Sequence, residues 1–283
     1  MAPPIYAGPV EKTWYYSFRV ICALIFIFLI GPLFIIVPLS FNAEPYFNFT
    51  PEMLSLDPAG FSTRWYVDFW SDANWRLAVQ NSFVIAIFAT LISTTLGTLA
   101  ALGLSRSEMP FKTLVMALMI SPMIVPLIIS AAGMYFFYSR IGLASTHVGV
   151  ILAHAALGTP FVVITVTATL VGFDHSLTRA AANLGAHPTT VFFKVIVPLI
   201  LPGVISGALF AFITSFDEVV VVLFVGSVEQ RTIPWAMFSG IREEISPTIL
   251  AVATLLITLS ILLLTTLELL RRRNERLRGL SPG

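Results

Sequence analysis

Long apolar blocks are the feature that most restricts what this sequence can fold into. Six of them can be marked, at residues 20–39, 82–104, 113–138, 148–173, 195–226 and 248–270. A helix of about twenty apolar residues crosses the hydrocarbon core of a bilayer, so every block is long enough to span a membrane. Charged residues make up only 11% of the 283 residues, whereas soluble domains carry about a quarter. The sequence therefore predicts an all-α membrane protein with about six transmembrane helices.

The block at residues 195–226 is longer than a single span requires. Its 32 residues would form a straight helix of about 48 Å, while the other five blocks fit one helix each. Pro198 and Pro202 lie near its start, and Asp217 and Glu218 interrupt its end. We therefore expect this block to break near the two acids. The first block is too long for the core of a cleavable signal, and it is expected to be a retained span.

Lysine and arginine are unevenly distributed over the connecting segments. If the N-terminus lies in the cytoplasm, the cytoplasmic segments hold eleven of these residues and the outer segments hold five. Cytoplasmic loops are enriched in both residue types, and an even number of spans also places both termini on the same side. The sequence thus predicts one transmembrane domain over 1–283. Its parts are a cytoplasmic N-terminus (1–19), an extracytoplasmic loop (40–81), a cytoplasmic loop (174–194) and a basic cytoplasmic tail (271–283).

The first connecting loop, residues 40–81, mixes acidic and aromatic side chains. Tryptophan and tyrosine favour the depth of the lipid headgroups, so one interpretation is an interfacial belt lying on the membrane. The alternative is a docking surface for an extracytoplasmic partner, or a part of an outer gate. Spacing and composition leave both interpretations open.

A short amphipathic helix is predicted between the fourth and fifth blocks. Asp174 or Ser176 can cap its start, and Gly185 ends it at a position that favours a left-handed backbone. One helical face, at spacings i, i+3, i+4 and i+7, carries Leu177, Ala180, Ala181 and Leu184. This small face suits close insertion into a groove on another protein. An ordinary interfacial helix between two spans has the same spacing and is the alternative.

The same segment carries a family resemblance. Ala180-Ala181-x-x-x-Gly185, followed downstream by Leu201-Pro202-Gly203, resembles the signature loop of ABC-importer permeases. The resemblance implies a type I ABC-importer permease fold and a coupling helix that inserts into a cleft of the ATPase subunit. The positions it assigns to that contact are Leu177, Arg179, Ala180, Ala181, Leu184 and Gly185. Arg179 stands where the family motif has Glu, so this chain has a cation and not a carboxylate at that position.

A narrower resemblance lies further along the chain. Ser215-Phe216-Asp217-Glu218, then Thr232-Ile233-Pro234 and Ile245-Ser246-Pro247, is similar to the second permease of spermidine/putrescine-type transporters. It implies an importer for polyamines, or for another small organic solute such as an amino-acid derivative. The implied partners are an ABC ATPase dimer that binds ATP and Mg, a second homologous permease, an extracytoplasmic substrate-binding protein and membrane lipids.

Asp217 and Glu218 are the only acids deep inside an apolar block. Charged groups within a membrane are costly and usually face a cavity or a partner. Both are therefore candidates for the translocation path, where a carboxylate would attract an amine. They can instead be neutralised, cap a helix break or pair with a sister subunit. A different class of protein, an ion-coupled secondary transporter, also builds ion sites at broken helices.

Several kinds of chemistry find no support in the sequence. It has no phosphate-binding loop of the type Gly-x-x-x-x-Gly-Lys-Ser/Thr, so ATP must be bound and hydrolysed elsewhere. No catalytic set of side chains is recognisable. The single cysteine permits neither an internal disulfide nor a cysteine metal site, and no basic stripe suggests nucleic acid. The expectation is a chain that is not an enzyme and holds no cofactor or metal of its own.

Overall fold

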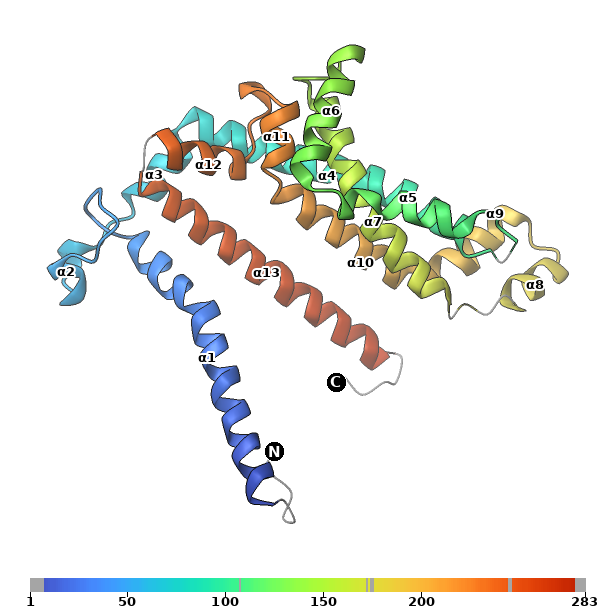
Figure 1. Cartoon of the computed structure of the whole chain (residues 1–283), viewed down its shortest axis with the longest axis horizontal. Coiled ribbons are helices and arrows are strands. Elements are labelled where there is room, and N and C mark those ends of the chain that lie inside the picture. The colour runs from blue at the N-terminus through green and yellow to red at the C-terminus, as the bar shows by residue number, and fades with distance from the viewer. Residues whose placement is uncertain (1–7, 107, 172, 174–175, 244–245, 278–283) are drawn as a thin grey trace. The chain divides into compact units, whose positions relative to one another are not determined.

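The computed structural model describes residues 8–106, 108–171, 173, 176–243 and 246–277. Within these residues all regular secondary structure is helical, which confirms the predicted all-α fold, and one isolated antiparallel bridge joins Asn42 to Phe61. The chain divides into two compact units (Figure 1). One consists of Met1–Asp72 with Gly240–Gly283, and the other consists of Ala73–Ser239.

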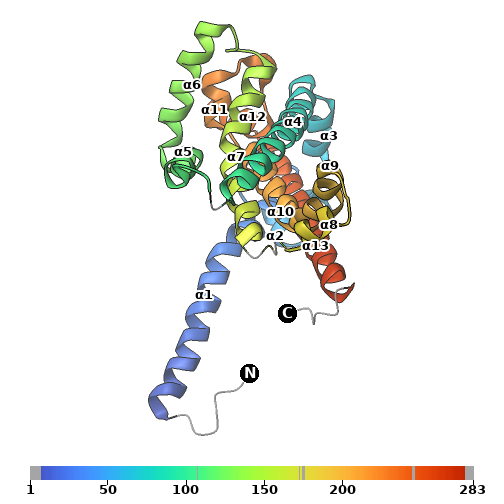
Figure 2. The ribbon, with the colours of Figure 1, turned by 90° about the vertical axis from the view of Figure 1, so that its right-hand side faces the viewer.

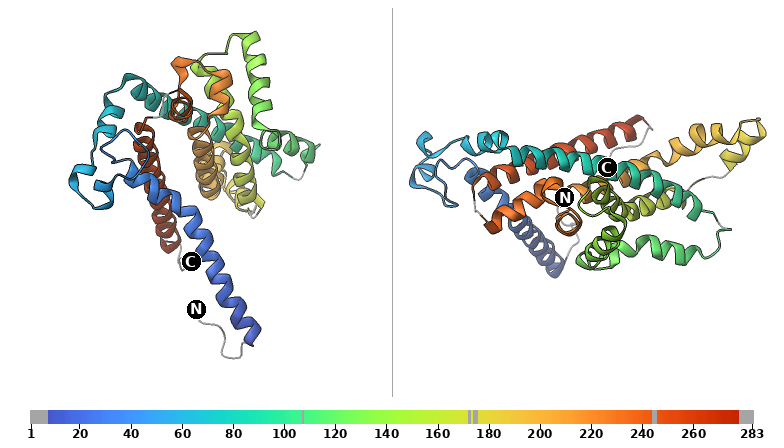
Figure 3. Two further views of the ribbon diagram at one scale, coloured as in Figure 1. Left: turned by 60° about the vertical axis from the view of Figure 1, so that its left-hand side comes forward. Right: turned by 90° about the horizontal axis from the view of Figure 1, so that it is seen from above.

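The first unit contains two long helices, α1 (Pro9–Leu39) and α13 (Thr248–Leu277), which contact each other. They are the blue and red helices of Figure 3. Both extend beyond the apolar blocks that predicted them. At the start of α1 the backbone N–H of Gly8 donates a 3.0 Å hydrogen bond to the carboxylate of Glu11. This bond satisfies a donor that has no partner within the helix, so the polar turn before the apolar block is helical too.

The segment after α1 is folded around the buried side chain of Asn42. Its amide nitrogen donates to the carbonyls of Tyr46 (3.0 Å) and Asn48 (2.9 Å). The indole N–H of Trp65, on α3 (Arg64–Ser71), donates to the carbonyl of Asn42 at 2.8 Å. Two short elements, α2 (Pro51–Leu54) and η1 (Pro58–Gly60), lie between them. Much of the predicted loop 40–81 is therefore ordered helix and turn, and its last residues belong to α4.

The second unit is built on α4 (Ala73–Leu104), α7 (His147–Val171) and α10 (Val197–Phe216), each of which packs on the other two (Figure 2). Its other elements are α5 (Lys112–Ile124), α6 (Leu127–Ile141), α8 (Ser176–Asn183), α9 (Pro188–Val191), η2 (Phe192–Ile196), α11 (Val220–Val225) and η3 (Val228–Gln230). The chain passes from this unit to the first within α12 (Ile233–Glu243).

Small residues allow these three helices to approach closely. A Cβ atom added to Gly207 of α10 would lie 2.5 Å from the hydroxyl of Thr165 and 2.8 Å from Cα of Val162, both on α7. A Cβ added to Gly158 of α7 would lie 2.8 Å from the hydroxyl of Ser93 on α4. Such contacts are typical of helix packing in membranes, where van der Waals fit replaces the hydrophobic effect.

The helices agree with most of the predicted spans. In the described part of the chain four helices are long and apolar enough to cross a membrane: Pro9–Leu39, Ala73–Leu104, His147–Val171 and Pro188–Phe216. The last predicted block is represented by the apolar helix Thr248–Leu262 at the start of α13, which is shorter than these four and does not by itself count as a span. Helices α5 and α6 would together give a further span.

The third block is where the prediction of one helix per block is wrong. Helices α5 and α6 meet at an angle of 103° instead of continuing as one rod. The break falls at Val125, which is extended (φ −70°, ψ 134°), and at Pro126. A proline lacks the N–H that an uninterrupted helix needs, and it disfavours helical geometry in the preceding residue. Pro122, by contrast, is accommodated within α5.

Candidate coupling and translocation sites

The predicted amphipathic helix is present as α8, Ser176–Asn183. Asp174, one of the two expected caps, lies outside the described residues, and Ser176 is the first residue of the helix. Gly185 has the expected left-handed backbone, with φ +80°. Its N–H donates to the carbonyl of Ala182 at 2.9 Å, and the N–H of Ala186 donates to that of Ala181 at 3.1 Å. This pair of bonds is the Schellman arrangement that terminates many helices.

None of the side chains of α8 is buried in this chain. Leu184 is 89% exposed and Leu177 is 45% exposed, although both are large apolar residues. Arg179 and Ala180 are exposed as well, and Ala181 is half-buried. The helix touches the chain only at α9 and η2 among the elements with substantial contact. The face predicted from the spacing is therefore open.

The segment after α8 is continuous with the longest element of the second unit. Helix α9 begins with Pro188 at its first position, where a missing N–H costs nothing. It continues through η2, a π-helical turn closed by a bond from the N–H of Val197 to the carbonyl of Phe192, into α10. The wide turn directly precedes Pro198, whose ring would otherwise meet the carbonyl of the preceding turn. Pro188–Phe216 therefore runs as one helical rod of 29 residues, about 43 Å long.

The two acids lie at the opposite end of this rod from α8, and the helix breaks there as predicted. Asp217 follows the last residue of α10, and its N–H donates to the carbonyl of Ile213 at 3.0 Å. Its side chain is exposed. Glu218 is only 8% exposed, and its carboxylate accepts a 2.9 Å bond from the N–H of Val221 in the first turn of α11. Adjacent acids thus have different surroundings.

The turn at the acids is anchored by a buried apolar cluster. Three valines of α11, at 221, 222 and 225, are fully buried against Ile85, Val150 and Leu157. The carbonyl of Val225 also accepts a 2.8 Å bond from the N–H of Ser145, just before α7. The position of Asp217 is therefore fixed by packing on both sides of the break.

A buried polar pair beside the break was not identified from the sequence. His154 of α7 is 1% exposed, and its Nδ1 lies 2.9 Å from the hydroxyl of Ser215 on α10. Its Nε2 has no hydrogen-bond partner among the described residues. A histidine within an apolar block indicates that some polar contact exists. The sequence does not indicate which residue makes it, because Ser215 is 61 residues away from His154.

A second unforeseen contact set holds the loop after α11. The side-chain amide of Asn81 on α4 donates to the carbonyls of Glu229 (2.8 Å) and Arg231 (2.9 Å), and its oxygen lies 3.0 Å from Nε2 of His147. The neighbouring hydroxyl of Ser82 accepts a 2.8 Å bond from the N–H of Ile233. The Thr232-Ile233-Pro234 motif is therefore held in place by the start of α4.

The described residues contain no group of three or more His, Cys, Asp or Glu side chains that could hold a metal ion. Three polar groups lie at the break: the exposed carboxylate of Asp217, the buried carboxylate of Glu218 that caps α11, and the His154–Ser215 pair. These groups can attract and orient a charged solute. The His154–Ser215 pair is buried, and no third group among the described residues orients the histidine through its Nε2.

The helical fold is similar to one found in a solved ABC transporter. The fold matches that of a chain in the crystal structure of a bacterial ABC transporter involved in the import of the acidic polysaccharide alginate. The match covers 94% of this chain and 99% of that chain. The TM-score is 0.73 at 15% sequence identity. At that identity the likeness concerns the fold.

The chain belongs to the family of binding-protein-dependent transport system inner membrane components, whose model matches residues 93–276. It is 33% identical over 251 residues to the spermidine/putrescine transport system permease protein PotC of Haemophilus influenzae, which covers 89% of this chain and 95% of that protein. It is also 33% identical over 245 residues to the putrescine transport system permease protein PotI of Escherichia coli K12, covering 84% of each.

Family membership makes this chain a multi-pass component of the inner membrane and a transport subunit without catalytic activity. An ion-coupled secondary transporter, the alternative of a different class, is set aside, because the family works with a binding protein.

Proposed function

We propose that this chain is the permease subunit of an ATP-driven importer of polyamines such as putrescine or spermidine. The observation that carries the proposal is the similarity to two polyamine permeases, which extends over 89% and 84% of the chain. An exposed carboxylate at a helix break is in keeping with a solute that bears amino groups. Another small organic solute, such as an amino-acid derivative, is the alternative.

Asp217 is the stronger of the two candidates for contact with the solute. Its carboxylate is exposed, whereas that of Glu218 is buried and engaged by the N–H of Val221. A carboxylate that already caps a helix has less capacity to bind an amine. In the proposed path Asp217 attracts the solute, and Glu218 holds the turn that positions Asp217.

The coupling site is assigned to α8 and the residues that end it. Leu184 and Leu177 are apolar side chains left exposed by this chain, and a groove on an ATPase subunit would cover them. The assignment includes Arg179, Ala180, Ala181 and Gly185 on the grounds of the motif. The remaining proposed partners are a second permease and an extracytoplasmic binding protein, while ATP and Mg belong to the ATPase.

The proposed topology has both termini and the loop 174–194 in the cytoplasm, with residues 40–81 outside. The part of the basic tail at 278–283 and the first residues at 1–7 lie outside the described residues. In this topology α8 is at the cytoplasmic end of the rod Pro188–Phe216, and Asp217 is at its outer end. Closure of the ATPase would displace α8, and the rod would carry that movement to the acids, giving alternating access.

Uptake kinetics test the solute contact. We expect Asp217→Asn to raise the KM for putrescine by roughly tenfold or more, because a hydrogen bond to a charged group contributes about 1.5–3 kcal/mol. Glu229→Gln, at another exposed acid of the same unit, is the matched control and should leave KM unchanged. An unchanged KM for Asp217→Asn would remove this residue from the path.

Competition for uptake tests the solute class separately. We expect unlabelled spermidine to compete with labelled putrescine in cells that carry the intact importer, and neutral amino acids to have no effect. Competition by an amino-acid derivative, with none by polyamines, would favour the alternative solute.

A further inference from the structure

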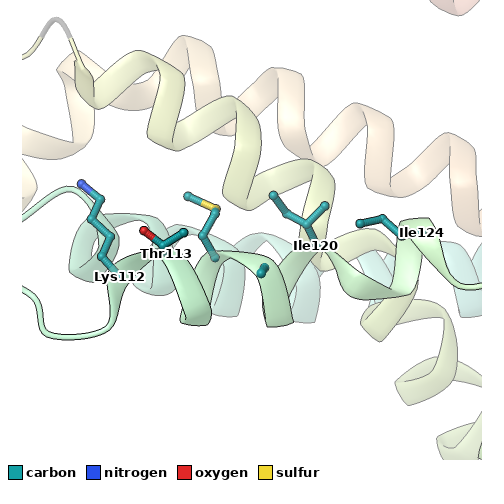
Figure 4. Close-up of a pocket in the computed structure, with 6 residues that line it drawn as sticks. Lys112, Thr113, Ile120 and Ile124 are labelled. Carbon is teal, nitrogen blue, oxygen red and sulfur yellow. The ribbon is translucent and has the colours of Figure 1, made fainter.

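Helix α5 bears an open groove apart from the coupling helix and the two acids. It has a volume of about 420 Å³ and is lined by Lys112, Thr113, Met116, Ala117, Ile120 and Ile124. Figure 4 shows the labelled side chains leaving the helix on one side. The spacing of these residues, with steps of four along the helix, places them in one stripe.

The two ends of the groove differ in polarity. Lys112 and Thr113 supply an ammonium group and a hydroxyl at the first turn, and the remaining four residues are apolar. The side chain of Lys112 is exposed. The exposed cation therefore stands at one end of an apolar strip.

The length of the strip matches half a bilayer. From Lys112 to Ile124 the helix rises about 18 Å, and one leaflet contributes about 15 Å to the hydrocarbon core. A ligand that fits has an anionic group followed by an apolar chain of about one leaflet. A cationic solute such as a polyamine does not fit, because Lys112 would repel it.

We propose that this groove binds an anionic phospholipid, with the phosphate on Lys112 and an acyl chain along Met116, Ile120 and Ile124. Basic residues beside membrane helices on the cytoplasmic side recognise such headgroups. In the topology proposed above, on which the choice of leaflet rests, Lys112 lies on that side. The opposite side of α5 carries the apolar side chains Leu114 and Leu118, each 59% exposed, without a neighbouring cation on that side of the helix.

Native mass spectrometry of the full chain in mild detergent tests the proposal without any transport measurement. The probes are phosphatidylglycerol and phosphatidylcholine with identical acyl chains. We expect phosphatidylglycerol to be retained preferentially, and Lys112→Gln to lower its retention about fivefold, the factor expected for one basic residue near an anionic headgroup. Arg106→Gln, at an exposed cation outside the groove, is the control and should retain the lipid normally.

A second variant tests the apolar part of the groove. Ile120→Trp should fill the strip and also reduce retention of phosphatidylglycerol, while added inorganic phosphate should not displace the lipid. Equal retention of both lipids, or equal losses for Lys112→Gln and Arg106→Gln, would overturn the proposal. So would efficient cross-linking of Ile120→Cys to a second permease subunit, because the groove would then be a protein interface. All these outcomes are independent of whether the solute is a polyamine.

Discussion

The two ends of the rod Pro188–Phe216 differ in nearly every physical respect. At one end α8 is exposed and rests on the adjacent turns α9 and η2. Leu177 within it is 45% exposed, and Leu184, directly after it, is 89% exposed. At the other end the acids lie beside fully buried valines and a buried His154–Ser215 pair. The exposed apolar end suits the proposed contact with an ATPase subunit, whereas the packed end with one exposed carboxylate suits the proposed contact with the solute.

The largest effect is expected at the exposed end. Ala181→Trp places an indole on the small face of α8. A bulky group at a close-packed contact costs about 1–3 kcal/mol, so we expect the amount of ATPase retained on purification to fall by roughly 5-fold to 150-fold. Transport should fall with it. The chain itself should stay folded, because α8 has no buried side chains.

Ala182→Trp is the matched control for this variant. Ala182 is exposed on the same helix, and the helical spacing turns it away from Ala181 and Leu184. Full retention of the ATPase by Ala182→Trp and loss by Ala181→Trp would locate the contact on the predicted face. Equal behaviour of the two variants would contradict it.

The rod between the two ends should be sensitive to added volume. Gly207→Ala introduces a methyl group 2.5 Å from the hydroxyl of Thr165 and 2.8 Å from the backbone of Val162. Since backbone must shift to admit it, we expect a loss of about 1–3 kcal/mol in unfolding free energy. Unfolding in detergent, followed by circular dichroism, measures the change.

Gly133→Ala is the control for this prediction, because nothing lies within 4 Å of a Cβ added at that position. An alanine there should leave stability unchanged or raise it slightly. If both variants were equally stable, the close approach of α10 to α7 would not limit the stability of the unit.

A smaller effect is expected from the buried acid. Glu218→Ala removes the acceptor for the N–H of Val221, and we expect a loss of about 0.5–2 kcal/mol, the usual cost of deleting a helix cap. The KM for putrescine should change less than in Asp217→Asn. A large KM effect with unchanged stability would instead place Glu218 in the path and reverse the roles of the two acids.

Local chemistry predicted the exposed end more completely than the packed end. The position of α8, its open face and the left-handed Gly185 all follow from contiguous residues, because caps and helical spacing act over a few positions. The same kind of signal predicted the break at Asp217. It also missed the bend at Pro126, since a proline inside an apolar block is compatible with either a tolerated kink, as at Pro122, or a complete break.

The contacts that fix the packed end join residues far apart in the sequence. Asn81 bonds to the carbonyls of Glu229 and Arg231, and His154 lies beside Ser215. No periodicity connects such positions. For the same reason the sequence did not distinguish the two adjacent acids. Whether Glu218 is buried depends on how α11 packs against α6 and α7, and the spacing of residues in one sequence does not encode that packing.

Arg179 gives the finest test of what kind of contact the exposed end makes. It stands where the resembling motif has Glu, and its side chain is exposed. If binding of the ATPase depends on the small face formed by Ala180 and Ala181, Arg179→Glu should change ATPase retention by less than about twofold, because exposed ion pairs contribute little. The measurement is the salt dependence of retention for the wild-type and variant chains. A marked gain at low salt that disappears at high salt would mean that a cation on the ATPase meets this position, and that charge as well as shape selects the partner.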